Sequence, residues 1–522
     1  MKHLFIFLPL LILVVACKHS TIKSKTYSVD IPQKNEVGVK LLPTEIAKVE
    51  APFSIIEFTK PVFPDDTVCL KLKKDSINTS IIQKAINHLS LKGGGVIVVP
   101  VGNWLSGRII LKDNVNLHFN DGAAMTFSGN IEDYQPAVFS RFEGVEVMSF
   151  GACIYANNAK NIAITGNGKL IGPKEGFETQ NIPPVEFIDM DKPVAERIVD
   201  GVHTKEVFPP MFISPINCTK VFIEGISLEN TAFWNIVPVY CDNVIIRGVT
   251  VNSVGIPRGD GIDIESTKNV LIEYCNLSCG DDCFTMKAGR GEDGIRVNKP
   301  TENVVVRNCL ALKGHGGVTC GSETAGVIRN LYVHDCVFID SGVGVRFKTR
   351  RPRGGGGENL YYERVRMDLY GDAFKWDMLG SRKYVGNLAD RLPFRQVTKL
   401  TPYYKNIHIK DIVVENASCF IKAKGIPESP INNVTIENAQ VKCKKAFFAH
   451  DIHNLTINKI KIESNDTLLT FIDSRNVKMS NLDFNTPVCL HIEGECSDSV
   501  SVASSVNIKD TVYVISVSEN GK

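Results

Sequence analysis

The sequence predicts an all-β fold in which short parallel strands stack as the coils of a solenoid, with an amphipathic helix covering the N-terminal end. Two observations predict it. From residue 161 onward an Asn is followed, again and again, by apolar residues one, three and six positions later, which is the signature of a repeat architecture. Ahead of these repeats, residues 79–90 carry apolar side chains at helical spacing, and a solenoid needs its open end covered.

The chain begins with a segment that has the form of an export signal. A short basic start precedes an apolar run from Leu4 to Val15, and the run ends at Val14-Val15-Ala16-Cys17. The run is too short to span a bilayer, and its end resembles a bacterial lipoprotein processing site. We therefore expect residues 1–16 to be a signal peptide and Cys17 to be lipidated, so that the protein is exported and held on an envelope membrane, in the periplasm or at the cell surface. An ordinary secretory signal that is cut elsewhere is the alternative.

Composition sets limits on partners. The 522 residues carry a net charge of +2, which gives no global reason to expect binding to nucleic acid or to an anionic membrane. The lipid anchor is the only membrane element that we expect. We expect residues 17–60 to form a lipidated tether and an N-terminal strap, and residues 61–522 to form one solenoid domain. We also expect a monomer.

Within residues 79–90 the apolar positions are Ile81, Ile82, Ala85, Ile86 and Leu89, and this stripe predicts the capping helix.

The repeat itself predicts which side chains point inward. Its Asn residues are Asn161, Asn243, Asn269, Asn303, Asn330, Asn359, Asn406, Asn433, Asn454 and Asn476, with Lys220 in the same place of a further copy. Asn243 and Asn269 are 26 residues apart, because 269 minus 243 is 26. The residues one and three positions after each Asn share one face of a strand, so we expect them in the core. The Asn suits a turn that needs a left-handed backbone.

Cysteine occupies the sixth position of three repeats. The series reads Val249, Cys275, Cys309, Cys336, Val365, Ile412, Ala439, Ile460 and Leu482. Because cysteine alternates there with aliphatic residues, we interpret these thiols as stacked core side chains. The group Cys275, Cys279 and Cys283 matches no pairwise C-x-x-C spacing of a metal site. The sequence leaves open a disulfide between neighbouring coils.

Polar motifs concentrate between Arg258 and Lys348. They are an Asp in a glycine-flanked turn (Asp260), a Gly-Asp-Asp that contains Asp281 and Asp282, a Gly-His-Gly around His315, and the pair Arg346 and Lys348. Asp281 and His315 each lie 12 residues after an Asn of the repeat, and the other motifs lie at similar phases. Since coils stack at about the 4.8 Å spacing of strands, we expect one groove to receive a polar group from each of four coils.

Two long segments, 172–215 and 368–402, break the rhythm of the repeat. We expect both to be elaborations beside the groove.

The order of the motifs, G-G-G-V-x-V-x-P, D-G-x-D, G-D-D-C, G-H-G and R-x-K, resembles the polygalacturonase family, glycoside hydrolase family 28. The resemblance covers roughly residues 65 to 480. It implies a right-handed, pectin-lyase-like parallel β-helix that hydrolyses galacturonic-acid-containing pectin or oligogalacturonides. It also implies that residues 61–522 form the catalytic domain.

The resemblance also implies roles for individual residues. Asp281 would be the general acid, Asp260 and Asp282 would hold and activate the water, and His315 would support the acid. Arg346 and Lys348 would bind a substrate carboxylate. A Tyr often joins the site in this family, and Tyr361, Tyr362, Tyr370 and Tyr384 are all candidates.

General chemistry agrees with this assignment. Hydrolysis with inversion needs an acid and a base about 6.5–9.5 Å apart, a separation that we expect adjacent coils to supply. Packing three carboxylates together disfavours full ionisation, so that one can keep its proton. We expect neither a metal nor a cofactor.

The chain departs from the usual family motif at one position that bears on specificity. The family's Asn-Thr-Asp is here Arg258-Gly259-Asp260, and we expect Arg258 to contact a terminal uronate. Together with segment 172–215, this predicts exo action.

The alternatives are a hydrolase of rhamnogalacturonan or other pectin side chains in the same family, a pectate lyase, and a carbohydrate-binding solenoid without catalysis. A lyase would need a calcium-binding carboxylate cluster and an Arg or Lys base.

Overall fold

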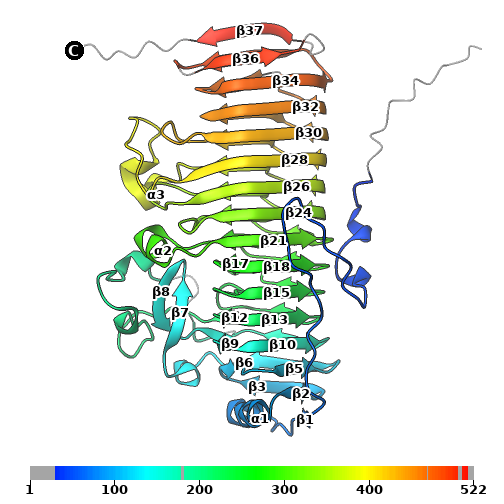
Figure 1. Ribbon diagram of the computed structural model, residues 1–522, viewed down its shortest axis with the longest axis vertical. Helices are drawn as coiled ribbons and strands as arrows, with labels where there is room; N and C mark the ends of the chain where they lie inside the picture. The colour runs from blue at the N-terminus through cyan, green and yellow to red at the C-terminus, as the bar shows by residue number, and fades with distance from the viewer. Residues whose placement is uncertain are drawn as a thin grey trace, which may run out of the picture.

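The computed structural model describes residues 30–173, 175–177, 182–466, 468–495, 497–503 and 508–514. The chain forms a right-handed, single-stranded parallel β-helix, and its coils stack along the long axis of the molecule (Figure 1). This confirms the predicted all-β solenoid. Cys17 and the proposed signal lie outside the described residues. In the part of the chain that the structure describes, no helix has the length and apolarity needed to cross a membrane.

Parallel strands make up the two long faces of the helix. The 22-stranded sheet contains β1 (Thr67–Cys69), β2 (Gly95–Val99), β3 (Gly102–Ser106), β5 (Val115–Phe119), β6 (Ala123–Phe127), β10 (Lys160–Gly166), β11 (Lys169–Ile171), β13 (Thr219–Glu224), β14 (Ser227–Glu229), β15 (Asp242–Arg247), β16 (Thr250–Asn252), β18 (Lys268–Glu273), β19 (Asn276–Ser278), β21 (Thr301–Arg307), β22 (Leu310–Lys313), β24 (Ile328–Ile339), β26 (Gly356–Asp368), β28 (Tyr403–Asn416), β30 (Ile431–Cys443), β32 (Ile452–Ser464), β34 (Arg475–Phe484) and β36 (Asp498–Val502). The 10-stranded sheet contains β17 (Ile262–Glu265), β20 (Phe284–Lys287), β23 (Val318–Gly321), β25 (Val343–Lys348), β27 (Asp372–Asp377), β29 (Cys419–Lys424), β31 (Lys445–His450), β33 (Leu468–Ile472), β35 (Val488–Glu493) and β37 (Ile508–Val514).

Smaller elements complete the chain. A three-stranded sheet contains β4 (Ile109–Ile110), β9 (Ala152–Asn157) and β12 (Met211–Ile216), and β7 (Val138–Phe142) pairs antiparallel with β8 (Val145–Ser149). The helices are α1 (Thr79–Leu91), α2 (Gly291–Val297) and α3 (Arg382–Val385), with short 3-10 turns η1 (Lys34–Glu36), η2 (Val39–Leu41), η3 (Ile131–Tyr134), η4 (Val185–Phe187), η5 (Val194–Glu196) and η6 (Gly386–Ala389). Helix α1 covers the N-terminal end of the coils and buries Ile82, Ile86 and Leu89, as the periodicity predicts.

The repeated Asn residues form a ladder along one corner of the helix. All of them, and Lys220, have the predicted left-handed backbone; Asn303 has a φ of 57°. The Asn303 side chain donates to Asn269 Oδ1 at 3.2 Å and accepts from Asn330 Nδ2 at 3.0 Å. A second left-handed position, which the repeat analysis missed, lies five residues later, as at Asn308 with a φ of 53°. The strands therefore bend at these corners, and each bend is fixed by its neighbours.

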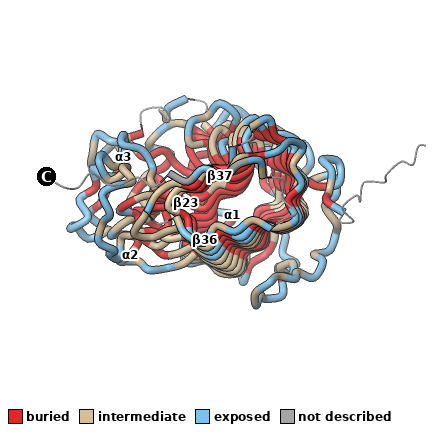
Figure 2. The backbone as a smooth tube through the Cα atoms, turned by 90° about the horizontal axis from the view of Figure 1, so that it is seen from above, coloured by how far each residue is buried: buried red, intermediate tan, exposed pale blue. Residues whose placement is uncertain are grey.

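The predicted inward positions line a continuous core, which Figure 2 shows as the buried inner wall of the coil. Val270 and Ile272 are fully buried, and so are Cys275, Cys309 and Cys336. Every described cysteine is a free thiol. The disulfide that the sequence left open is therefore absent among these residues, and the three core thiols simply pack.

Residues 30–66 run along the outer face of the 22-stranded sheet (Figure 1). Phe58 is buried against the outward side chains of β10 to β24. The buried Arg247 pairs with Glu273 at 2.7 Å and donates to Pro43 O at 2.7 Å. These contacts fasten the segment to the coils. The proposed boundaries between tether, strap and domain remain a prediction.

Both irregular segments lie on the opposite side of the helix from residues 30–66, together with α2, α3 and the β7–β8 hairpin (Figures 1 and 2). Residues from the first segment, such as Val185 and Phe208, share a small core with Phe142 of the hairpin. Arg391 anchors the second segment by pairing with Asp451 at 2.7 Å.

Candidate functional site

Four consecutive strands of the 10-stranded sheet carry the predicted polar motifs. β17, β20, β23 and β25 pair in parallel, with Ile262 opposite Phe284, Phe284 opposite Val318, and Val318 opposite Val345. Asp260 and Asp282 each stand two residues before a paired position, so they lie side by side on neighbouring coils. The structure therefore brings all four motifs together on one face, as their phase in the repeat predicts.

Asp281 and His315 form a pair across two coils. His315 Nδ1 lies 3.1 Å from Asp281 Oδ1, and the backbone N–H of His315 donates to the carbonyl of Asp281 at 2.9 Å. The glycine that follows the histidine leaves room for the next acid, because a Cβ at Gly316 would lie 2.7 Å from Asp282 Oδ1. The Gly-His-Gly motif thus fits against the carboxylates of both Asp281 and Asp282.

Asp282 is fully buried and binds the two predicted cations. Arg346 Nη1 donates to Asp282 Oδ1 at 3.0 Å, and Lys348 Nζ lies 3.4 Å from Oδ2. About a quarter of the Arg346 side chain and a third of the Lys348 side chain remain exposed (24% and 31%). Both cations therefore bind Asp282 and remain partly exposed in the groove.

The three acids lie closer together than the sequence analysis expects. One carboxylate oxygen from each of Asp260, Asp281 and Asp282 lies within 4.8 Å of the others. These nearest oxygens are closer than the separation of about 6.5–9.5 Å expected between the carboxyl groups, because Asp260 stands one strand spacing from Asp282 and Asp281 is next to Asp282 in sequence. Carboxylates at this distance can also coordinate a divalent cation. Here, however, Asp282 already binds two side-chain cations.

A buried ammonium group, which the sequence analysis missed, lies beneath the acids. Lys287, at the end of β20, lies 3.7 Å from Asp260, 3.4 Å from Asp263 and 3.4 Å from Glu323. It also lies 4.3 Å from the centroid of the Trp234 ring. The lysine is 2% exposed. A lysine four residues after the cysteine of the Gly-Asp-Asp-Cys motif was the available signal, since alternation along β20 places it on the face away from the core side chains of Phe284 and Met286.

Burial raises the pKa of two acids of this cluster, Asp260 and Asp263. It raises the pKa of Asp260 well above its usual range, and the charges of Asp263 and Asp281 add to the effect. Burial likewise raises the pKa of Asp263 to about 8. The pKa of Lys287 is lowered by burial, but Glu323, Asp263 and Asp260 together raise it well above its usual range. At neutral pH the cluster therefore holds protons on carboxyls and keeps its ammonium charged.

The pKa of Asp281 moves the other way. Burial and Asp282 push it upward, but the hydrogen bond from His315 and the charge of Lys348 outweigh them and lower it. The same hydrogen bond raises the pKa of His315. Burial also pushes up the pKa of Asp282, yet Lys348 and Arg346 hold it well below its usual range. In the free protein the proton near Asp281 therefore resides on His315.

Two cavities meet at Asp281. One, of about 220 Å³, is lined by Asp260, Lys287 and Trp234, and the other, of about 390 Å³, by His315 and Lys375. Both also include Asp281, Lys348, Arg350 and Tyr384.

Tyr384 is the candidate tyrosine that lines both cavities. Tyr362 is buried in the core beside Phe347, and Tyr361 stacks on His408 next to residues 51–53 of the strap. Tyr370 is 60% exposed and is not among the residues that line either cavity.

An end wall, formed by Glu143, Glu186, Arg258 and Arg290, borders the smaller cavity. Arg258 Nε lies 3.3 Å from Glu143, Arg290 lies 3.0 Å from the same carboxylate, and Arg290 also pairs with Glu186. Glu186 belongs to segment 172–215 and Glu143 to the turn between β7 and β8. The segment thus lies beside the groove, as expected, and Arg258 lines the cavity with its charge already paired.

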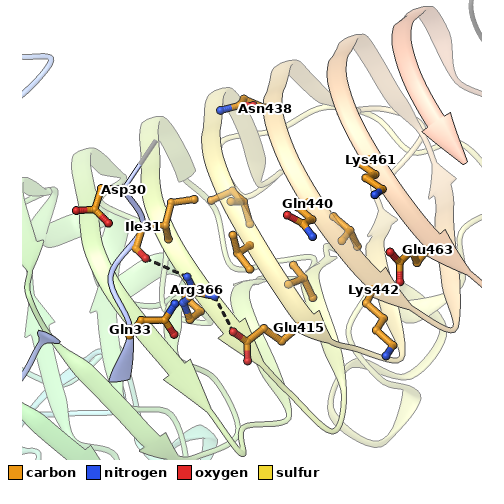
Figure 3. A pocket seen from close by; sticks show the side chains of 14 residues that line it. Asp30, Ile31, Gln33, Arg366, Glu415, Asn438, Gln440, Lys442, Lys461 and Glu463 are labelled. Carbon is orange, nitrogen blue, oxygen red and sulfur yellow. Dashed lines mark hydrogen bonds and ion pairs between the residues drawn. The ribbon is translucent and has the colours of Figure 1, made fainter. Parts of the chain in front are cut away.

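A third cavity, of about 490 Å³, lies elsewhere, on the outer face of β26 to β32 (Figure 3). Arg366 there donates to Ile31 O at 3.0 Å and to Pro32 O at 2.9 Å, and it pairs with Glu415 at 2.6 Å. Arg366 is therefore already held by the N-terminal segment and by Glu415, and no histidine of the described part of the chain lines this cavity, so it lacks the arrangement found at Asp281.

Known proteins are similar to this chain over the region that carries the groove motifs. A family model described as "Glycosyl hydrolases family 28" matches residues 199–371. A "Probable polygalacturonase" of Vitis vinifera is 28% identical over 376 residues, which are 70% of this chain and 71% of that protein. An endo-polygalacturonase of Pectobacterium carotovorum is 27% identical over 400 residues, 75% of this chain and 90% of that one.

Among solved structures, the hyperthermoactive exopolygalacturonase from Thermotoga maritima superposes with a TM-score of 0.68 at 26% identity, covering 78% of this chain and 93% of that chain. The family match contains every groove motif from Arg258 to Lys348.

Proposed function

This protein is a glycosidase that is similar to glycosyl hydrolases family 28 and to polygalacturonases, and we propose that it hydrolyses galacturonic-acid-containing pectin chains. One observation carries the proposal. A proton-sharing pair, Asp281 with His315, faces the same groove as two cations, Arg346 and Lys348, that an acidic sugar can contact. Acid chemistry and recognition of a carboxylate are thus combined at one place.

In the proposed reaction Asp281 gives a proton to the leaving glycosidic oxygen as the bond to the anomeric carbon breaks. His315 supplies that proton through its hydrogen bond, which accounts for the low pKa of Asp281 in the free protein. A water held by Asp260 and Asp282 adds to the anomeric carbon and loses its proton to the ionised acid of this pair. Arg346 and Lys348 hold the substrate carboxylate and keep Asp282 ionised.

Inversion of configuration is part of the proposal and rests on the family resemblance alone. Nearest oxygens within 4.8 Å lie below the window of about 6.5–9.5 Å that usually accompanies inversion. Proton NMR of the first anomer released from an oligogalacturonide decides between the outcomes, and the initial appearance of the starting anomer would contradict inversion.

The main test incubates the purified protein with oligogalacturonides and records reducing ends together with the absorbance of unsaturated products. Hydrolysis releases reducing ends without that absorbance. EDTA should leave the rate unchanged, because Asp282, one of the three clustered acids, is already paired with Arg346 and Lys348. Loss of activity in EDTA together with absorbing products would establish a lyase, and binding without cleavage would establish a carbohydrate-binding solenoid. Rhamnogalacturonan in the same assay tests the other pectin hydrolase activity.

Exo action is the proposed cleavage mode. The end wall borders the smaller cavity, which contains Asp260 and Asp281, and a groove that is closed on this side accepts a chain terminus but not a passing chain. A time course of polymer viscosity against released galacturonic acid tests this mode. Viscosity that collapses before monomer accumulates would indicate internal cleavage.

The proposed location is an envelope membrane, with Cys17 as the lipidated residue, as the form of residues 1–17 indicates. Cys17→Ser should abolish incorporation of labelled fatty acid and release the protein into the soluble fraction. Continued labelling of the variant would show that another residue is modified.

A further inference from the structure

Arg350 lies at the junction of the two groove cavities. It lines both of them, together with Asp281, Lys348 and Tyr384. Arg346, Lys348 and Arg350 alternate along one strand and its extension, so their side chains emerge on the same face. The motif that resembles the polygalacturonase family ends at Lys348, and nothing in it assigns a role to Arg350.

The charge of Arg350 is available, unlike those of its neighbours. Arg346 and Lys348 are held by Asp282 at 3.0 and 3.4 Å, and Arg290 is paired with Glu143 at 3.0 Å. Among the residues that the structure describes, no carboxylate pairs with Arg350, and its guanidinium lies over the ring of Tyr384. It is the groove arginine whose donors are not already used by an acid.

Two contacts fix the position of this side chain. Its guanidinium lies 4.9 Å from the centroid of the Tyr384 ring. Its aliphatic part packs against the loop after β27, where a Cβ added to Gly380 would lie 2.8 Å from Arg350 Cδ. A guanidinium that lies over an aromatic ring spends none of its N–H donors on an acid there, so these donors remain available for a bidentate carboxylate contact. Because the side chain is already placed, little conformational entropy is lost when a ligand binds.

We propose that Arg350, placed by Tyr384 and Gly380, is a specificity-determining residue that binds the carboxylate of a uronate unit next to the scissile bond. This inference rests on the proposed function of the groove and adds a second carboxylate contact beyond Arg346 and Lys348. Burial lowers the pKa of Arg350, so its charge is incompletely solvated and gains from an anionic partner. A methyl ester or a neutral sugar at this position lacks the charge that the guanidinium binds.

The test compares Arg350→Gln with Lys383→Gln. Lys383 is a matched control because it lies 5.6 Å from the same Tyr384 ring but is not among the residues lining the cavities. Loss of one charge-assisted contact should raise KM for trigalacturonate about ten- to a hundredfold while kcat changes less than about threefold. On the methyl-esterified trimer kcat/KM should change less than about threefold, and the control should match the wild type on both substrates.

A direct binding measurement separates this inference from the proposed function. Calorimetric titration of trigalacturonate into Asp281→Asn and into Asp281→Asn/Arg350→Gln should give dissociation constants that differ by about tenfold or more. If the wild type cleaves no oligogalacturonide but this ratio holds, the proposed function fails, whereas the contact between Arg350 and a uronate carboxylate stands. An unchanged dissociation constant, or an equal loss on acid and ester, overturns the inference.

Discussion

His315 and Asp281 share a hydrogen bond at the mouth of the groove, with Nδ1 3.1 Å from Oδ1. The two residues come from consecutive coils, and the backbone N–H of His315 also binds the carbonyl of Asp281 at 2.9 Å. The imidazole is exposed over 59% of its surface and the carboxylate over 23%. The pair can therefore take a proton from solvent on one side and deliver it to a ligand on the other.

Asp281→Asn should lower kcat by at least about 10³, because the amide removes both the proton donor and the charge that holds His315 in place. The melting temperature should change little, since the side chain lines the groove and not the core. Steady-state kinetics on trigalacturonate and thermal unfolding measure the two effects. A variant that retains more than about a tenth of wild-type activity would exclude Asp281 as the acid.

His315→Ala should move the alkaline limb of the kcat/KM profile to lower pH by about one unit or more. In the wild type the pair loses its proton at the raised pKa of His315, which faces Asp281, Asp282 and Arg346. Without the imidazole, the site depends on the proton of a carboxyl alone, whose ordinary range is lower. His88→Ala, on the exposed side of α1, is the matched control. A limb that stays in place would show that His315 only orients its partner.

The free energy of unfolding of the Asp263→Asn variant should increase relative to that of the wild type as the pH rises. The pKa of Asp263 is about 8 in the folded protein and near 3.9 in an unfolded chain. Between these values the folded state binds more protons, so wild-type stability falls with rising pH by at most about 1.4 kcal/mol per unit.

Asparagine cannot ionise, so the Asp263→Asn variant lacks this loss. Urea unfolding at pH 5 and pH 7.5 measures the difference in slope, with the exposed Asp75→Asn as control. Parallel stability curves for the variant and the wild type would argue that Asp263 is ionised in the folded state.

The repeat predicted much of the fold because its physical causes are local. A left-handed corner selects Asn, and apolar residues one and three positions later must then point inward, as Val270 and Ile272 do. The phase of Asp281 and His315 within the repeat also predicted that they lie on one face, one coil apart, because coils of similar length stack in register.

The rest of the site depends on loops whose lengths do not follow the repeat. Tyr384 and Glu186 reach the groove from irregular segments, so no count of residues from an Asn could place them. Lys287 lies on a strand, but its three carboxylate partners come from three different positions on neighbouring coils. The sequence also predicted that the three acids pack together, but it could not give the distance between their nearest oxygens, which depends on side-chain rotamers and on the spacing of the strands.

Asn303→Ala should destabilise the protein by about 2–5 kcal/mol, because alanine in the left-handed region costs about 1–2 kcal/mol and two ladder hydrogen bonds, of about 0.5–1.5 kcal/mol each, are lost. Asn303→Gly loses the same hydrogen bonds but accepts a φ of 57° without that steric cost. Chemical unfolding should therefore rank wild type, then glycine, then alanine. Equal losses in the two variants would assign the whole effect to the ladder.

Arg258→Asn should raise KM for acidic oligomers while leaving the protein as stable as before, or more so. Arg258 has a φ of 55°, a conformation that costs most residues about 1–2 kcal/mol and that asparagine tolerates better. Its ion pair with Glu143, at 3.3 Å and partly exposed, offsets at most about 1 kcal/mol. An arginine kept in an unfavourable backbone conformation beside the groove is expected to serve binding rather than folding.

In the proposed exo mode, the terminal uronate competes with Glu143 for this guanidinium. Glu143→Gln should therefore lower KM for acidic oligomers, whereas Arg258→Asn should raise it more than it lowers kcat. The double variant should resemble Arg258→Asn alone, because Glu143 acts through the arginine. Kinetics on trigalacturonate for the four proteins, with thermal unfolding of each, measures both effects. Independent, additive effects of the two substitutions would show that the end wall closes the groove without contacting the end of the substrate.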